Sequence, residues 1–309
     1  MAVLVPIIPC VSFFLFCSLI GFVGNTALII ATIQNKNLRN VNNILIALSA
    51  FGDILHQIGH IPFAYFIFTG ITFTPLWTCI WIQLLPNFGL NFAMAILLFT
   101  GIDRSMAILK PLSYRTMRRR ISIPLMTIPA TLYAIVILIL ACIYAINNDD
   151  KVVCVLVAIY SGQFDWIWGI LATFLNLATI TLYAVLSRII VKAEISTRNF
   201  ELLQTLKITV AFVGLGHLAS TTIYMIGRFL NISKIATFYI GCYAGVFINI
   251  SVSFNWLFYY WRSEEYRNAF RKQFKKLPCL KNTVNLQTKH KMQQVTTVYR
   301  LEPSRRLSH

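Results

Sequence analysis

Charged residues are scarce in this sequence. Only 12% of the 309 residues are Asp, Glu, Lys or Arg, whereas a soluble domain carries about 25%. Apolar runs of about 18 residues or more, the length that spans a bilayer, recur instead along the chain, and the mean hydropathy is +0.69. This composition argues against a large soluble protein and predicts an all-α membrane protein.

Several other features are missing too. The seven cysteines include no CxxC pair, which argues against a disulfide scaffold and against a zinc module. Histidines, cysteines and carboxylates do not gather at one depth, so we expect neither an intramembrane enzyme nor a resident metal. No internal repeat is visible, and the pattern lacks the paired broken helices of many transporters. The first apolar run has no basic n-region and is too long for a cleavable signal peptide.

Seven apolar segments are present, and a polar stretch follows them. The segments span residues 6–32, 43–68, 76–108, 121–146, 162–191, 202–230 and 235–261. Each is long enough to cross a membrane as a helix. The sequence therefore predicts a seven-transmembrane helix bundle over residues 1–261, an amphipathic eighth helix over 262–277 and a disordered basic tail over 278–309.

The 27 basic residues fall mainly on one side of the predicted membrane. The connections after the first, third and fifth segments hold two, six and four of them, and the stretch from Arg262 onward holds twelve. Because Lys and Arg concentrate in cytoplasmic loops, we predict a multi-pass plasma-membrane protein with an extracellular N-terminus and a cytoplasmic C-terminus. The net charge of +17 follows these loops rather than one soluble face, so nucleic acid is not an expected partner.

An acid and a base, Asp103 and Arg104, stand together at the end of the third segment. A charge at the bilayer centre costs on the order of 2.5–3.5 kcal/mol, so we expect this pair near a membrane surface, partnered and functional. Cys79 lies 25 residues earlier, which as a helix is about 37 Å and reaches the opposite face. A disulfide between Cys79 and Cys154 is permitted in that oxidising space; two free thiols are the alternative.

Polar side chains in three segments share a depth. Asn25, Asp53, Ser251 and Asn255 lie roughly 9–15 Å from the cytoplasmic edge of their helices at about 1.5 Å per residue. A lone carboxylate there must face inward and find partners. These residues predict a hydrated polar core that holds a cation or switches hydrogen bonds, with a static helix–helix hydrogen-bond cluster as the alternative.

Four short motifs carry a family resemblance. They are GFVGN at Gly21–Asn25, NNILIALSAFGD at Asn42–Asp53, GIDR at Gly101–Arg104 and NWLFY at Asn255–Tyr259. Their order, depth and sidedness together resemble the rhodopsin-like (class A) family of G-protein-coupled receptors. The GIDR variant, the short termini and the missing helix prolines are most similar to the nematode serpentine chemoreceptors, the SX class.

The resemblance implies a chemosensory receptor that binds a small molecule and activates a heterotrimeric G protein. Asp103, Arg104, Tyr114, Asn255 and Tyr259 would then form the coupling switch. The family's loop disulfide corresponds to Cys79 and Cys154. The family's sodium site corresponds to the polar core of Asn25, Asp53, Ser251 and Asn255. No other cofactor is expected.

The sequence departs from the family pattern at several points. Ser105 replaces the Tyr of the family's DRY motif, and Trp256 replaces the Pro of its NPxxY motif. Ala93 stands where the sodium site usually has Ser. The last three segments contain no proline, so Gly214 and Gly216 are the expected flexible point of the sixth helix.

The expected ligand pocket lies in the outer half of the bundle. Its aromatic and amide content suits a small, mostly apolar ligand with a few hydrogen bonds. By analogy with the family, the absence of an outer aspartate in the third segment argues against an aminergic receptor. The seventh segment has no lysine, which excludes a retinal Schiff base. Packing or lipid contact is the alternative role for each candidate. The candidates are His60, Asn87, Asn91, Asp165, Trp166, Tyr224 and Tyr243.

The remaining predictions concern the membrane surface. Tyr266, Phe270 and Phe274 recur every four residues among basic residues, the pattern of an interfacial helix whose apolar side lies in lipid. Cys279 follows that helix and is placed for palmitoylation, and the tail beyond is a place for arrestin or a kinase. Asn231 begins an N-x-S sequon in the third outer loop.

Two other functions fit the same composition. A transporter or channel is the first, and a neuropeptide receptor of the same fold is the second. Ligand-dependent nucleotide exchange on a Gα subunit, compared with substrate flux in vesicles, separates a receptor from a transporter.

Overall fold

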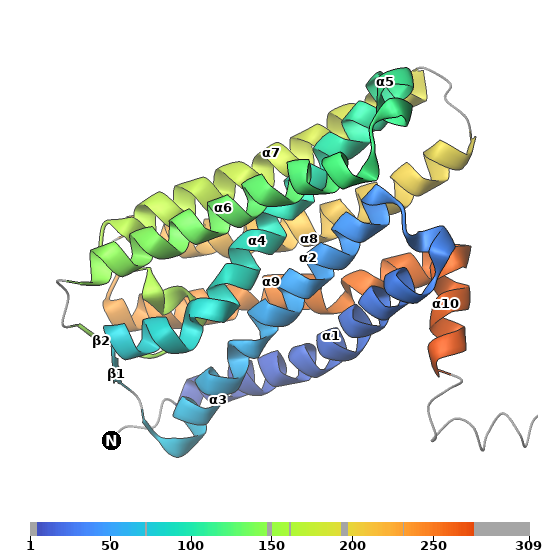
Figure 1. Cartoon of the computed structure of the whole chain (residues 1–309). Coiled ribbons are helices and arrows are strands. Elements are labelled where there is room, and N and C mark those ends of the chain that lie inside the picture. The colour runs from blue at the N-terminus through green and yellow to red at the C-terminus, as the bar shows by residue number, and fades with distance from the viewer. Residues whose placement is uncertain are drawn as a thin grey trace, which may run out of the picture.

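The computed structural model describes residues 5–71, 73–146, 150–160, 162–192, 197–230 and 232–274. They form a bundle of long helices packed side by side (Figure 1). Within these residues, seven helices are long and apolar enough to cross a membrane. The predicted all-α, seven-transmembrane fold is therefore confirmed.

The elements follow one another in the order expected of such a bundle. The helices are α1 (Ile8–Gln34), α2 (Val41–Ile58), α3 (His60–Thr69), α4 (Leu76–Leu109), α5 (Pro111–Thr116), α6 (Arg119–Ala145), α7 (Phe164–Lys192), α8 (Thr197–Phe229), α9 (Lys234–Arg262) and α10 (Glu264–Phe274). Three 3₁₀ turns, η1 (Val5–Ile7), η2 (Lys36–Leu38) and η3 (Leu156–Ile159), and two short antiparallel strands, β1 (Thr74–Pro75) and β2 (Lys151–Val152), complete the described chain.

The second membrane segment is two helices rather than the continuous helix predicted over 43–68. Gly59 separates α2 from α3. Pro62 lacks the backbone N–H that would bond to the carbonyl of Ile58, and this loss breaks or kinks a helix. Gln83 of α4 donates through Nε2 to the Gly59 carbonyl oxygen at 3.1 Å. The break therefore brings a backbone acceptor into contact with α4.

Glycines set the spacing between α2 and α4. A Cβ on Gly89 would lie 2.5 Å from the Leu55 Cβ, and a Cβ on Gly52 would lie 2.9 Å from the Gly89 carbonyl oxygen. Such close approach of two backbones is possible only with small residues at the contact. The inner and outer polar residues of α4 are therefore held close to α2.

The outer ends of the helices are covered by the segment between α6 and α7. Cys79 and Cys154 are joined by a disulfide with a Cα–Cα distance of 5.4 Å, so the alternative of two free thiols does not hold. Behind this bond, Leu156, Ile159 and Tyr160 are buried among side chains of the bundle. The loop thus covers these helix ends and also inserts side chains between the helices.

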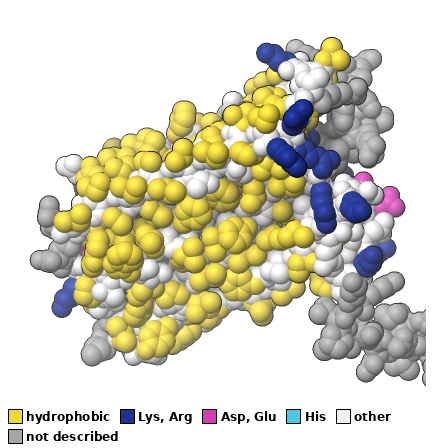
Figure 2. Space-filling model, in the orientation of Figure 1, with side chains coloured by type: hydrophobic (Ala, Val, Ile, Leu, Met, Phe, Trp, Pro, Cys, Tyr) yellow, Lys and Arg dark blue, Asp and Glu magenta, His cyan; other side chains and the backbone are white. Residues whose placement is uncertain are grey.

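The molecular surface has the distribution expected of a membrane protein. Hydrophobic side chains cover the length of the bundle, while Lys and Arg gather at the end that carries α5 and α10 (Figures 1 and 2). Leu19, Trp81 and Phe174 are each more than 60% exposed. So large an apolar surface is not stable in water, and the chain is a multi-pass membrane protein.

The eighth helix, α10, is described over Glu264–Phe274, and its apolar side packs against the bundle. Tyr266 and Phe270 are buried, and the Tyr266 hydroxyl lies 3.0 Å from the Thr32 hydroxyl of α1. The expectation that this apolar side lies in lipid is wrong, because it packs against side chains of α1 and α9. Residues 275–309, which include Cys279, lie outside the described residues, as does Asn231.

Candidate functional site

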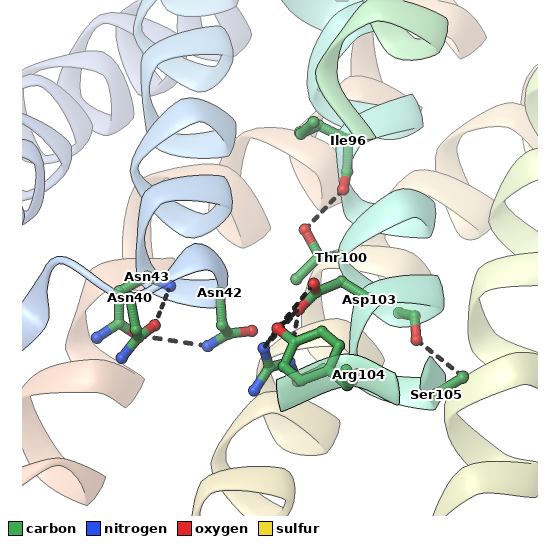
Figure 3. A network of polar contacts seen from close by, with 10 residues as sticks. Asn40, Asn42, Asn43, Ile96, Thr100, Asp103, Arg104 and Ser105 are labelled. Atoms are coloured by element: carbon green, nitrogen blue, oxygen red, sulfur yellow. Dashed lines mark hydrogen bonds and ion pairs between the residues drawn. The ribbon is translucent and has the colours of Figure 1, made fainter. Parts of the chain in front are cut away.

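A three-residue network closes the inner end of α4. Arg104 donates through Nε to Asp103 Oδ2 at 3.0 Å, and Tyr114 donates through Oη to Asp103 Oδ1 at 2.9 Å. The Tyr114 oxygen accepts in turn from Arg104 Nη2 at 3.0 Å. Figure 3 shows Asp103 and Arg104 turned toward each other below Thr100. Because Asp103 is fully buried, its charge depends on these two partners.

Tyr114 is supplied by α5, an element that the sequence segments did not include. Pro111 opens α5 at the first helical position, where its missing N–H costs nothing. Burial, more than the neighbouring charges, raises the pKa of Tyr114 to about 12. The phenol therefore stays neutral at physiological pH and keeps the proton that it donates to Asp103.

The Arg104 guanidinium is less enclosed than its partner. Its side chain is 21% exposed, and its Cζ lies 5.9 Å from the centroid of the Tyr114 ring. Among the residues that the structure describes, Asp103 is its ion-pair partner. The Arg104 guanidinium is thus held at the surface of the basic end by Tyr114 of α5 and by the neighbouring Asp103.

Tyr183 of α7 is a polar group near this network that the sequence analysis missed. Its ring packs on α4, where a Cβ on Gly101 would lie 2.7 Å from Tyr183 Cε2. Its hydroxyl is buried without a hydrogen-bond partner in the described part of the chain. A tyrosine in the inner half of a membrane segment was the available signal, because a buried phenol normally finds a partner.

Tyr259, one of the predicted switch residues, lies farther toward the eighth helix. It is 4% exposed, and its ring centroid lies 5.6 Å from that of Tyr266. Asn255, one turn earlier on α9, lies next to the Asp53 carboxylate of α2. The predicted switch residues therefore occupy three places: the network at Asp103, the polar core at Asn255 and the contact of Tyr259 with α10.

The predicted polar core is buried, and its residues leave oxygen acceptors free. Asn25, Asp53 and Asn255 are each at most 5% exposed. Asn25 donates through Nδ2 to the Val252 carbonyl at 3.3 Å. One side-chain oxygen of each of the three, Asn25 Oδ1, Asp53 Oδ2 and Asn255 Oδ1, has no partner among the described groups.

These free acceptors fit a hard cation, which takes oxygen ligands. Water molecules would satisfy them as well. Ser251 does not join them, because its hydroxyl donates to the Ile248 carbonyl at 2.8 Å and packs against Gly216 of α8. Within the described residues, no three His, Cys, Asp or Glu side chains are arranged to hold a metal ion.

The outer half contains a second network, and it joins α4 to the loop before α7. Asn91 donates through Nδ2 to the Tyr160 oxygen at 2.8 Å, and Tyr160 donates to Asn87 Oδ1 at 2.9 Å. Trp168 of α7 donates through Nε1 to Asn91 Oδ1 at 3.1 Å. Two of the predicted pocket residues therefore meet, but around a tyrosine that the sequence analysis did not single out.

A third group pairs α7 with α8. Tyr224 donates to Asp165 Oδ1 at 2.9 Å, and Arg228 Nε lies 2.8 Å from Asp165 Oδ2. Asp165 and Tyr224 were both predicted pocket residues, and the structure brings them together. Their polar atoms bind each other and Arg228.

The remaining pocket candidates lie apart from one another. Trp166 lines an open apolar hollow of about 510 Å³ on the outside of the bundle between α7 and α8. Tyr243 is 46% exposed and donates to the Pro6 carbonyl at 2.7 Å. His60 is buried with its ring 4.8 Å from that of Phe14. The structure therefore brings the candidates together in two pairs, Asn87 with Asn91 and Asp165 with Tyr224.

One comparison with known proteins gives a match. A family model described as serpentine type 7TM GPCR chemoreceptor Srsx matches residues 18–274. The matched residues run from the first half of α1 to the end of α10 and cover most of the chain. No curated protein matches it.

Proposed function

The chain belongs to the Srsx family of serpentine seven-transmembrane chemoreceptors, and from this membership we propose that it binds a small molecule in the outer half of the bundle and activates a heterotrimeric G protein. The basic end, with Asp103 and Arg104, faces the cytoplasm in this proposal, and the N-terminus lies outside. The concentration of Lys and Arg at that end supports this orientation.

The observation that carries the proposal is the Asp103–Arg104–Tyr114 network. It holds a guanidinium at the basic end of the bundle by the adjacent Asp103 and by Tyr114 of α5, and a shift of α5 relative to α4 would break the bond to Tyr114. An agonist that binds one conformation more tightly shifts the population toward it. The released Arg104 would then meet the C-terminal carbonyls of a Gα helix, which favour a cation.

The polar core has a supporting role in this proposal. A sodium ion or ordered water at Asp53 would link α1, α2 and α9, because each of these helices contributes one buried oxygen without a partner among the described groups. Arrestin or a kinase would act on the tail, and lipids would surround the bundle. Nothing in this scheme requires an enzymatic step.

Arg104→Ala tests the coupling role. We expect the variant to reach the cell surface like wild type but to give no response, in a calcium or cyclic-nucleotide assay, to the volatile or water-soluble compounds that activate wild type. Lys110→Ala is the matched control, because Lys110 is an exposed basic residue at the same end of α4. An Arg104→Ala variant that signals like wild type would refute the role.

A transporter gives a different result in the same preparation. Vesicles that hold the purified protein would then accumulate a substrate, and no Gα subunit would exchange nucleotide. That combination would overturn the receptor proposal.

A further inference from the structure

Tyr160 occupies a socket in the outer half of the bundle. Its ring stacks on the indole of Trp168 with centroids 4.2 Å apart and planes 15° apart. Its hydroxyl lies between Asn87 Oδ1 and Asn91 Nδ2, at 2.9 and 2.8 Å. The residue is 3% exposed, so ring and hydroxyl are both enclosed. We call Asn87, Asn91 and Trp168 the Tyr160 socket.

The occupant belongs to a loop, whereas the socket belongs to two helices. The loop is anchored by the disulfide at Cys154 and by the Asn87 Nδ2 bond to the Leu156 carbonyl, 2.8 Å long. Beyond Tyr160, Gly162 adopts a positive φ of 62°, a conformation that glycine adopts without strain. Because Tyr160 belongs to this loop and the socket belongs to α4 and α7, displacement of Tyr160 would be a movement of the loop relative to these helices.

The socket selects a particular chemistry. It presents one acceptor, one donor and one flat aromatic face, and none of its three residues carries a charge. Burial raises the pKa of the Tyr160 phenol, so the occupant is neutral. A phenol hydroxyl both donates and accepts, whereas an indole N–H only donates. An indole would therefore leave one N–H of the Asn91 amide without its acceptor, and a plain hydrocarbon ring would also leave Asn87 Oδ1 without its donor.

A further polar atom lies beside the occupant. The Tyr133 side chain of α6 packs against the cluster that contains Tyr160, and its hydroxyl is buried without a hydrogen-bond partner in the described ranges. An unpaired buried hydroxyl costs free energy. A ligand with a second polar substituent would remove that cost, which Tyr160 itself does not.

We propose that Tyr160 is a built-in occupant of the ligand site, and that the ligand is a small neutral phenol that displaces it from Asn87, Asn91 and Trp168. The proposal rests on the proposed function for the idea that a small molecule binds in the outer half. Its test does not involve a G protein, so a receptor that fails to couple can still pass.

The test uses full-length receptor in lipid nanodiscs and p-cresol, which has the ring and hydroxyl of a tyrosine side chain. Tyr160→Ala empties the socket. We expect p-cresol, at about five times its dissociation constant, to raise the melting temperature of this variant by about 2–4 °C. Indole should raise it less and toluene least. Adding Asn91→Leu should abolish the preference for p-cresol over toluene.

Tyr65→Ala is the matched control, because Tyr65 is a 60% exposed tyrosine of α3. It should show no stabilisation specific to p-cresol. Equal effects of p-cresol and toluene on Tyr160→Ala, or no effect of either, would overturn the proposal, because the socket would then not recognise the hydroxyl.

Tyr160→Phe keeps the test valid if the alanine variant does not fold. It retains the stacked ring and loses both hydrogen bonds, so the loop holds the socket less tightly. The p-cresol concentration for half-maximal stabilisation should fall about tenfold from wild type to Tyr160→Phe, as expected for two lost hydrogen bonds. An unchanged concentration would contradict displacement of Tyr160 by the ligand.

Discussion

Tyr114 is the residue on which the inner network depends, because its single hydroxyl oxygen bonds to both charges. Without it, Asp103 keeps the adjacent Arg104 as its one side-chain partner among the described residues, and Arg104 loses its hydrogen bond to α5. Asp103 and Arg104 are neighbours in α4, so their ion pair does not connect α4 to α5. The hydrogen bonds of the Tyr114 hydroxyl make that connection.

Tyr114→Phe should therefore weaken the resting state. We expect a loss of about 1–2 kcal/mol of stability from the missing hydrogen bonds and a rise in agonist-free nucleotide exchange on Gα, measured at equal surface expression. Tyr65→Phe is the control, because Tyr65 is 60% exposed. Basal exchange equal to that of wild type would show that the hydroxyl does not restrain Arg104.

At the level of single residues, the sequence predicts those functional groups whose burial costs much free energy. Asp103, Arg104 and Asp53 can be identified because charge in a membrane segment demands partners. Tyr160 cannot, because a tyrosine in an aperiodic loop is expected on the surface and nothing local shows that it enters the bundle. The disulfide at Cys154 is the only sequence signal that the loop lies near α4.

At the scale of the helices, the contact of α2 with α4 is set by two glycines. A side chain at Gly89 would meet Leu55, the backbone nitrogen of His56 and the backbone of Gly52 at 2.5–2.8 Å. Backbone cannot rotate away as a flexible side chain can. The contact therefore has no room for even one methyl group.

Gly89→Ala should lower the melting temperature of the purified receptor by several degrees, since overpacking costs about 1–3 kcal/mol. Gly227→Ala is the matched control, because a Cβ there would lie 3.5 Å from its nearest neighbours, an ordinary contact distance. Equal melting temperatures for Gly89→Ala and Gly227→Ala would show that α2 and α4 pack less closely than described.

The helices themselves were predictable, but their interruptions were not all recognised. Apolar length identifies a membrane span whether or not its backbone is continuous, so the segment over 43–68 was predicted as one helix. Pro62 was the available signal of the break, because proline removes a helical hydrogen bond. The short helix α5 was missed since six residues carry no detectable periodicity.

For the whole molecule, the asymmetry of basic charge is the property from which we predict the orientation in the membrane. Lys151 lies on β2, in the segment that carries Cys154. Lys110 directly follows α4 at the opposite end of the bundle. Both side chains are exposed. The two positions therefore report the two faces of the membrane.

Single cysteine substitutions at these positions test the orientation. A membrane-impermeant maleimide should label Lys151→Cys on intact cells and should label Lys110→Cys only after permeabilisation. The unsubstituted receptor measures background labelling of its own thiols. Labelling of Lys110→Cys on intact cells would place Arg104 outside the cell, where no G protein could reach it.

Agonist-free nucleotide exchange on a panel of Gα subunits, with purified receptor in vesicles, tests the coupling role of Arg104 most directly. Three forms are compared: wild type, Tyr114→Phe, and Tyr114→Phe combined with Arg104→Ala. Exchange should rise from wild type to the single variant and fall below the wild-type rate in the double variant. A double variant that exchanges nucleotide as fast as the single variant would contradict the claim that the released Arg104 guanidinium activates the G protein.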